Sequence, residues 1–147
     1  MVEDFYTRGE KLINENEVVD YVCKYLKENQ YNINEHKNTS ERGYDIVALG
    51  KNGKKLIIEA KGGTSSKSGT KRFGKDFDSK QVRHHVAMAL YAASNAINSD
   101  PDCEVGIALP QNDSHLKAVN KIQKVIELLD IRIYWVSDNG EVTIGLN

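Results

Sequence analysis

Cysteine and proline are scarce in this chain of 147 residues, which contains two of each. Cys23 and Cys103 lie far apart, too few for a disulfide framework or a zinc knuckle, so we expect both to be reduced residues in or near the core. No apolar run approaches the ~20 residues that a membrane helix needs. The first fifteen residues hold no apolar segment of the kind that a signal peptide contains. We therefore expect a cytoplasmic protein.

The chain also has no internal repeats, no proline-rich linker and no acidic tail. Hydrophobic residues make up 39% of the sequence and charged residues 28%, a balance typical of a folded globular protein. The length fits one domain of ordinary size and leaves little room for a second. We predict a single domain over residues 1–147.

An overall excess of positive charge is absent as well, because the formal net charge is −1. The basic residues are nevertheless concentrated between Lys61 and His85, where seven of them stand against two acidic residues. This distribution predicts a contact with a polyanion such as DNA. A solvated, lysine-rich loop is the alternative. The seven are Lys61, Lys67, Lys71, Arg72, Lys75, Lys80 and Arg83.

The spacing of apolar residues predicts nine elements. Helices are expected over about 14–29, over about 79–98 with Ser79 as the N-cap, and over roughly 114–129. Strands are expected over 31–35, 44–49, 55–61, 105–109, 131–136 and 142–146. The order α-β-β-β-α-β-α-β-β predicts an α/β domain with a mixed central sheet.

Three functional side chains are expected to converge at one end of the hairpin over residues 44–61. Glu59 and Lys61 lie two residues apart on one strand and therefore share a face. A turn over 50–53 folds the strand of Asp45 back against them. Two registers are open: one places Asp45 opposite Ile58, the other opposite Ala60. Both bring Asp45 within one residue of Glu59.

Two adjacent carboxylates repel each other and need a compensating cation. Oxygen ligands with open positions suit Mg²⁺, or Mn²⁺ in its place. The Ala60 carbonyl is a candidate third ligand beside Asp45 and Glu59. Lys61 can orient or deprotonate a water and stabilise charge at phosphorus. An ion cluster at the end of a surface strand is the alternative interpretation.

The segments Tyr44-Asp45-Ile46-Val47-Ala48 and Leu56-Ile57-Ile58-Glu59-Ala60-Lys61 resemble the PD-(D/E)XK nuclease superfamily, which includes restriction endonucleases. The resemblance implies a restriction-endonuclease-like three-layer sandwich and Mg²⁺-dependent endonuclease activity on DNA. Tyr44 stands where that family often has proline, and Ala60 replaces a bulkier residue. Neither difference removes a catalytic group.

The superfamily commonly supplies a further carboxylate from the first helix, and Glu15 and Glu17 are the candidates here. A helical projection places Glu15 about 20° from Val22, on the apolar face, and Glu17 about 140° away. An acid that faces the interior needs a partner, which a metal ion provides. We therefore prefer Glu15 as an accessory catalytic and metal-binding residue. Its alternative role is to stabilise the first turn of the helix through a favourable interaction with the helix dipole.

Gln81 opens the second long helix, where some branches of the superfamily carry a glutamine, and we expect it to hold a metal-bound water or contact DNA. Lys80, Arg83 and His85 are expected to reach phosphate. The adjacent histidines do not favour a zinc site. His36 and His115 are expected at the surface.

The segment 62–78 is long and irregular, which favours a functional loop. Its lysines and its Ser, Thr and Gly residues can contact phosphate, while Phe73 and Phe77 anchor it or stack on a base. Met88, Tyr91 and His84 share the helix face opposite the core, which favours a homodimer or a second layer of the same domain. The rival functions are a catalytically silent nucleic-acid-binding module and an interaction subunit of a larger complex.

Overall fold

The computed structural model describes residues 12–36, 43–64 and 77–145. Six strands form one sheet in the order β1-β2-β3-β4-β5-β6. The pairs β1–β2, β2–β3 and β5–β6 are antiparallel, whereas β3–β4 and β4–β5 are parallel. The strands are β1 (Asn32–His36), β2 (Ile46–Leu49), β3 (Lys55–Ala60), β4 (Glu104–Pro110), β5 (Ile131–Val136) and β6 (Val142–Ile144). The predicted mixed α/β fold is confirmed.

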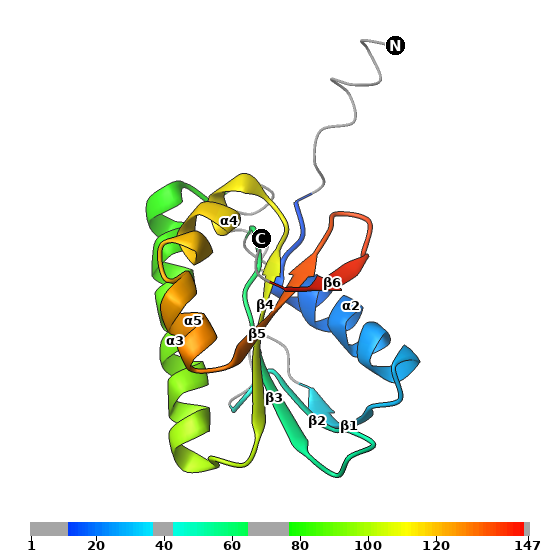
Figure 1. The fold of residues 1–147 in the computed structure, drawn as a ribbon. Helices are drawn as coiled ribbons and strands as arrows, with labels where there is room; N and C mark the ends of the chain where they lie inside the picture. Colours follow the sequence, from blue (N-terminus) through cyan, green and yellow to red (C-terminus); the bar gives the residue numbers. More distant parts are fainter. Residues whose placement is uncertain (1–11, 37–42, 65–76, 146–147) are drawn as a thin grey trace.

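Helices cover both faces of this sheet (Figure 1). One face carries α2 (Glu15–Glu28), and the other carries α3 (Ser79–Ser99), α4 (Asp113–Asn120) and α5 (Gln123–Leu128). Two buried apolar clusters result, because side chains alternate along each strand. Ile58 joins the cluster under α2, and its neighbour Ile57 joins the cluster under α3.

Two details of the helices differ from the predictions. Asp78, not Ser79, is the N-cap of α3: its side chain accepts the backbone N–H of Gln81 at 2.8 Å. The helix expected over 114–129 is two helices, broken at Lys121 and Ile122. Neither proline nor glycine stands at the break, and the apolar spacing continues through it, so the pattern predicted one helix.

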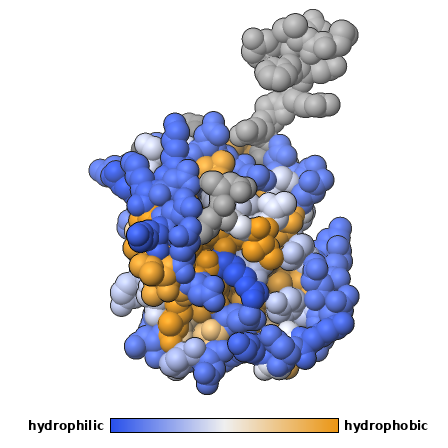
Figure 2. Space-filling model, viewed as in Figure 1, coloured by the Kyte–Doolittle hydropathy of each residue, from blue (hydrophilic) through white to orange (hydrophobic). Residues whose placement is uncertain are grey.

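The surface shown in Figure 2 is mostly hydrophilic with several apolar areas. Met88 and Tyr91 of α3 are exposed, as the prediction of an outward-facing apolar stripe requires. Leu128 of α5 is also largely exposed. Within the described residues, no helix is both long and apolar enough to cross a membrane.

Candidate active site

The hairpin of β2 and β3 brings Asp45 next to Glu59. Ile46 pairs with Ile58 and Leu49 with Lys55, and continuing this register by one residue sets Asp45 against Glu59. The register lies between the two that we considered, so the expected pairings of Asp45 with Ile58 or Ala60 are wrong. A hydrogen bond between the two carboxyl groups shows that they are in direct contact.

A backbone hydrogen bond fixes the orientation of the Asp45 carboxylate. The N–H of Ala60 donates to Asp45 Oδ2 at 2.7 Å, and the Asp45 residue is only 7% exposed. In the continued register Tyr44 would stand opposite Ala60, but the strand ladder ends at Ile46. The Asp45 carboxylate thus accepts the Ala60 N–H in place of a backbone carbonyl of β2. The end of β2 therefore sets the orientation of the Asp45 side chain.

Two glycines bring the first helix to the same place. Gly62 and Gly63 follow the Glu59–Lys61 segment, and the N–H of Gly63 donates to the Ile13 carbonyl at 2.8 Å. A Cβ on Gly62 would stand 2.3 Å from the backbone nitrogen of Glu15. Glycine is needed at position 62 because the two backbones approach so closely. The segment predicted as an irregular loop therefore begins with two glycines that lie against the start of α2.

The structure separates the roles of Glu15 and Glu17. Glu17 belongs to a capping box, in which its Oε1 accepts the N–H of Asn14 at 3.1 Å and the Asn14 side chain accepts the N–H of Glu17 at 2.9 Å. Glu15 is partly buried and close enough to Asp45 and Lys61 for their charges to act on it. The position of Glu15 agrees with the helical projection.

Burial makes the ionised forms of these acids unfavourable. It raises the pKa of Glu15 to about 7, and the negative charge of Asp45 adds to this effect. Burial also raises the pKa of Glu59 to about 8, again with the charge of Asp45 and with a hydrogen bond between the two acids. Burial likewise raises the pKa of Asp45, opposed by the Ala60 N–H and by the hydrogen bond with Glu59. Burial and mutual repulsion therefore disfavour the state in which both carboxyl groups are ionised.

Lys61 supplies positive charge beside the acids. Its charge lowers the pKa values of Glu15, Asp45 and Glu59, but in each acid burial has the larger effect. Its backbone N–H donates to the Ala108 carbonyl of β4 at 3.0 Å, which holds the residue in line with β3. One ammonium group therefore faces three acids and does not neutralise them. A divalent cation would complete the charge balance.

The donor set fits a hard cation with open coordination positions. Among residues 12–36, 43–64 and 77–145, no group of three or more acidic, histidine or cysteine side chains is arranged to hold a metal ion. Mg²⁺ does not require such a cage, since it is usually held by one or two carboxylates together with waters and substrate phosphates. Asp45 and Glu59 are the pair that fits, and Glu15 is near enough for the charge of Asp45 to act on it. The Ala60 carbonyl remains a predicted ligand.

The start of α3 carries the other predicted residues. Lys80 and Arg83 are exposed, as contacts with phosphate require. The Gln81 side-chain oxygen accepts the N–H of Asp78 at 3.0 Å, so this amide serves the capping box, and its role toward water or DNA remains a prediction. Lys67, Lys71, Arg72, Lys75 and Phe73 lie outside the described residues.

Phe77 anchors the beginning of α3, as predicted. Its side chain packs against the apolar cluster under α3, and its N–H donates to the Gly63 carbonyl at 3.2 Å. The ring of His85 stands edge-on to Phe77, with 4.7 Å between ring centroids. Phe77 therefore joins the backbone that follows Lys61 to the side chain of His85.

The prediction that His115 lies at the surface is wrong. His115 is fully buried, with 0% of its surface exposed. It precedes the buried Val119 by four residues on α4, so both side chains lie on the same face of the helix. The four-residue spacing from Val119 is the sequence signal for this burial. The side chain of His36 lies outside the described part of the chain.

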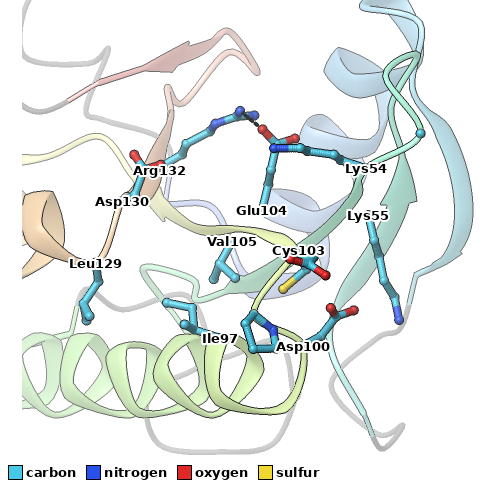
Figure 3. A pocket seen from close by; sticks show the side chains of 13 residues that line it. Lys54, Lys55, Ile97, Asp100, Cys103, Glu104, Val105, Leu129, Asp130 and Arg132 are labelled. Carbon is cyan, nitrogen blue, oxygen red and sulfur yellow. Dashed lines mark hydrogen bonds and ion pairs between the residues drawn. The ribbon is translucent and has the colours of Figure 1, made fainter.

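A separate hollow of about 610 Å³ lies at the other end of the sheet (Figure 3). It is lined by residues at the starts of β3, β4 and β5, among them Lys55 and Glu104. Arg132 forms an ion pair with Glu104 there. The candidate active site lies at the end of β3, where Glu59 stands, so this hollow is not part of it.

Comparisons with known proteins place the chain among α/β proteins without showing its family. The family model described as "Protein NO VEIN, C-terminal" matches residues 14–75, a segment that contains Glu15, Asp45, Glu59 and Lys61. No curated protein matches. The crystal structure of an FdxN element excision controlling factor protein from Anabaena variabilis is similar in fold, with a TM-score of 0.50 and 16% identity. The match covers 90% of this chain and 99% of that one.

Proposed function

We propose that the chain is a divalent-metal-dependent nuclease of the restriction-endonuclease-like, PD-(D/E)XK type that hydrolyses phosphodiester bonds in DNA. The observation that carries this proposal is the opposition of Asp45 and Glu59, both with raised pKa values, beside Lys61. Keeping acids in such a place costs free energy, which a bound cation recovers. The exposed Lys80 and Arg83 of α3 support the choice of a polyanionic substrate.

Each group has a defined task in this proposal. Asp45 and Glu59 hold Mg²⁺ or Mn²⁺, and the ion, when bound, supplies Lewis acidity at the scissile phosphate. Ala60 fixes Asp45 through its N–H and offers its carbonyl as a further ligand. Lys61 stabilises the negative charge that develops on the phosphoryl oxygens. Glu15 would be the accessory metal ligand.

Cleavage of supercoiled plasmid tests the proposal. The purified protein should nick plasmid with Mg²⁺ or Mn²⁺ and should not do so with EDTA. Asp45→Asn should reduce the nicking rate at least 100-fold, because one metal ligand is lost. Lys55→Met is the matched control, since Lys55 begins the same strand at its other end and is exposed. Equal rates for wild type and Asp45→Asn would remove the basis of the assignment.

The rival function is a nucleic-acid-binding module that does not cut. The absence of a three-ligand cage within the described residues favours it as the second candidate. Calorimetric titration with Mn²⁺ separates the two, because only the nuclease requires a binding isotherm that Asp45→Asn abolishes. A module that binds DNA without any response to metal would establish the rival.

A further inference from the structure

We propose that Asn112, His115 and His85 form a hydrogen-bonded relay that keeps the proton of His85 on Nδ1 and leaves its Nε2 free to accept the proton of the attacking water. His115 acts as a positioning residue, and His85 is a further catalytic residue. The inference rests on the proposed nuclease function. It concerns two histidines on α3 and α4, on the face of the sheet opposite α2 (Figure 1).

The tautomer of His115 follows from its contacts with Asn112. Asn112 Oδ1 accepts the backbone N–H of His115 at 3.0 Å, so this side-chain atom is the oxygen and not the amide nitrogen. His115 Nδ1 lies 2.8 Å from the same oxygen. An oxygen that only accepts requires a donor, so Nδ1 carries the proton. In the neutral ring, Nε2 is then an acceptor.

His115 remains neutral because it is buried. Burial lowers its pKa to about 4, and the positive charge that His85 can carry lowers it further. Its Nε2 has no hydrogen-bond partner in the structure. A buried acceptor without a partner costs about 1–3 kcal/mol. The fold therefore holds a fully buried acceptor that needs a donor.

His85 provides the complementary nitrogen. Its Nδ1 is also buried and without a hydrogen-bond partner, and the two rings are close enough for charge on one to act on the other. The helices that carry them, α3 and α4, pack against each other. A small rotation of either ring, or one buried water, joins Nδ1–H of His85 to Nε2 of His115. Both unpartnered atoms are then satisfied.

The relay ends beside the candidate active site. Burial lowers the pKa of His85, and the charge of Lys61 lowers it further, so the ring is near that ammonium group. Phe77 holds the ring edge-on and is itself bonded to the Gly63 carbonyl, two residues after Lys61. With Nδ1 directed at His115, Nε2 is the nitrogen left for solvent or substrate.

Hydrolysis of a phosphodiester bond needs a group that accepts the proton of the attacking water. In the proposed function Lys61 stabilises negative charge on the phosphoryl oxygens, and a neutral imidazole nitrogen is suited to accept that proton. In the proposed step, a water proton moves to His85 Nε2 and the water oxygen bonds to phosphorus. The bond from phosphorus to the leaving sugar oxygen breaks, and that oxygen takes a proton from solvent. His85 returns its proton to solvent, so the net reaction is hydrolysis.

Nitrogen NMR of the ¹⁵N-histidine-labelled protein tests the relay without any need for activity. We expect both His115 and His85 to be neutral Nδ1–H tautomers at pH 7.5. His115→Phe should shift His85 toward the Nε2–H form while leaving the exposed His84 unchanged. A wild-type His85 with its proton on Nε2 would overturn the relay, as would an unchanged His85 tautomer in folded His115→Phe.

Kinetics test the catalytic role. His85→Ala should lower kcat for plasmid nicking about 100-fold with KM within threefold of wild type, and added imidazole should restore part of the loss. His84→Ala, on the same helix, is the matched control and should retain wild-type rates. If wild type cuts DNA and His85→Ala cuts as fast as His84→Ala, the inference fails and the nuclease proposal stands. If wild type cuts nothing, the nuclease proposal and the catalytic role fail, while the tautomers still decide the relay.

Discussion

At the scale of single residues, the candidate active site places two buried carboxyl groups side by side, where their negative charges repel. Asp45 and Glu59 face each other across two strands, and each has a raised pKa mainly because it is buried. Carboxyl groups whose pKa values are raised by burial concentrate at binding and catalytic sites. The same arrangement makes the stability of the metal-free protein depend on pH.

Replacing Glu59 by glutamine should stabilise the metal-free protein at alkaline pH. The pKa of Glu59 is about 8 in the fold, above its ordinary value of 4.5. A raised pKa contributes stability that is complete below pH 4.5 and is lost as pH rises through about 8. Glu59→Gln never ionises, so its free energy of unfolding should exceed that of wild type by about 1 kcal/mol at pH 8.5, after allowance for solvent screening.

Thermal denaturation in EDTA measures this difference. The expected gain in Tm at pH 8.5 is about 3 °C, with no gain at pH 4.5. Glu141→Gln is the control, because Glu141 is exposed in the turn before β6. A Tm of Glu59→Gln that is lower than wild type at pH 8.5 would show that the ionised acid is not the unfavourable state.

Much of this site could be predicted from the sequence at the residue scale. Alternation along β3 placed Glu59 and Lys61 together, and helical projection selected Glu15. The register of Asp45 was wrong by one residue because it depends on how the turn closes. Gly50 donates to the Lys54 carbonyl and Gly53 donates to the Gly50 carbonyl, a pattern that the turn residues alone do not specify.

At the scale of elements, the position of α2 depends on Gly62. An isolated parallel bridge joins Asn14 to Thr64, and the backbone of Gly62 passes against the first turn of α2. This contact sets Glu15 beside the hairpin. It links residues far apart in the sequence, which is why local patterns did not reveal it.

Gly62→Ala should therefore displace α2 from the site. The added Cβ would lie 2.3 Å from the Glu15 nitrogen and 2.6 Å from the Asn14 carbonyl carbon, both of them backbone atoms. We expect a loss of about 1–3 kcal/mol in the free energy of unfolding and at least a tenfold loss in Mn²⁺ affinity. Denaturant unfolding and calorimetry measure the two effects.

Gly63→Ala is the matched control for that substitution. Its Cβ would meet the Ile13 carbonyl oxygen and Pro110 at 3.5 Å, which is ordinary van der Waals contact. We expect stability and Mn²⁺ affinity close to wild type. Equal behaviour of the two alanine variants would contradict the role assigned to Gly62.

Hydrophobic periodicity predicted the order of the elements, but we did not predict the helix break or the burial of His115. The break at Lys121 and Ile122 has no local signal in the sequence. His115 is buried because its face of α4, which it shares with Val119, packs in the core, while its partner Asn112 is local, three residues earlier at the N-cap of α4.

At the scale of the whole molecule, metal binding and protonation compete for the same site. Glu15, with a pKa of about 7, and Glu59, with a pKa of about 8, retain protons near neutrality, and a cation must displace them. Affinity for Mn²⁺ should therefore rise between pH 6.5 and 8.5, by about tenfold per unit for each proton released. Calorimetry at three pH values in buffers of different ionisation enthalpy measures affinity and proton release together. Affinity independent of pH would refute this competition.

The central claim is that Asp45, Glu59 and Lys61 form a hydrolytic site, and the nicking rate of Lys61→Met tests it most directly. This variant keeps both carboxylates and the length of the side chain but removes the charge that stabilises the transition state. At saturating Mn²⁺, the claim predicts that Lys61→Met nicks supercoiled plasmid at least 100-fold more slowly than wild type, while Lys55→Met stays within twofold. A rate for Lys61→Met within twofold of wild type would contradict it.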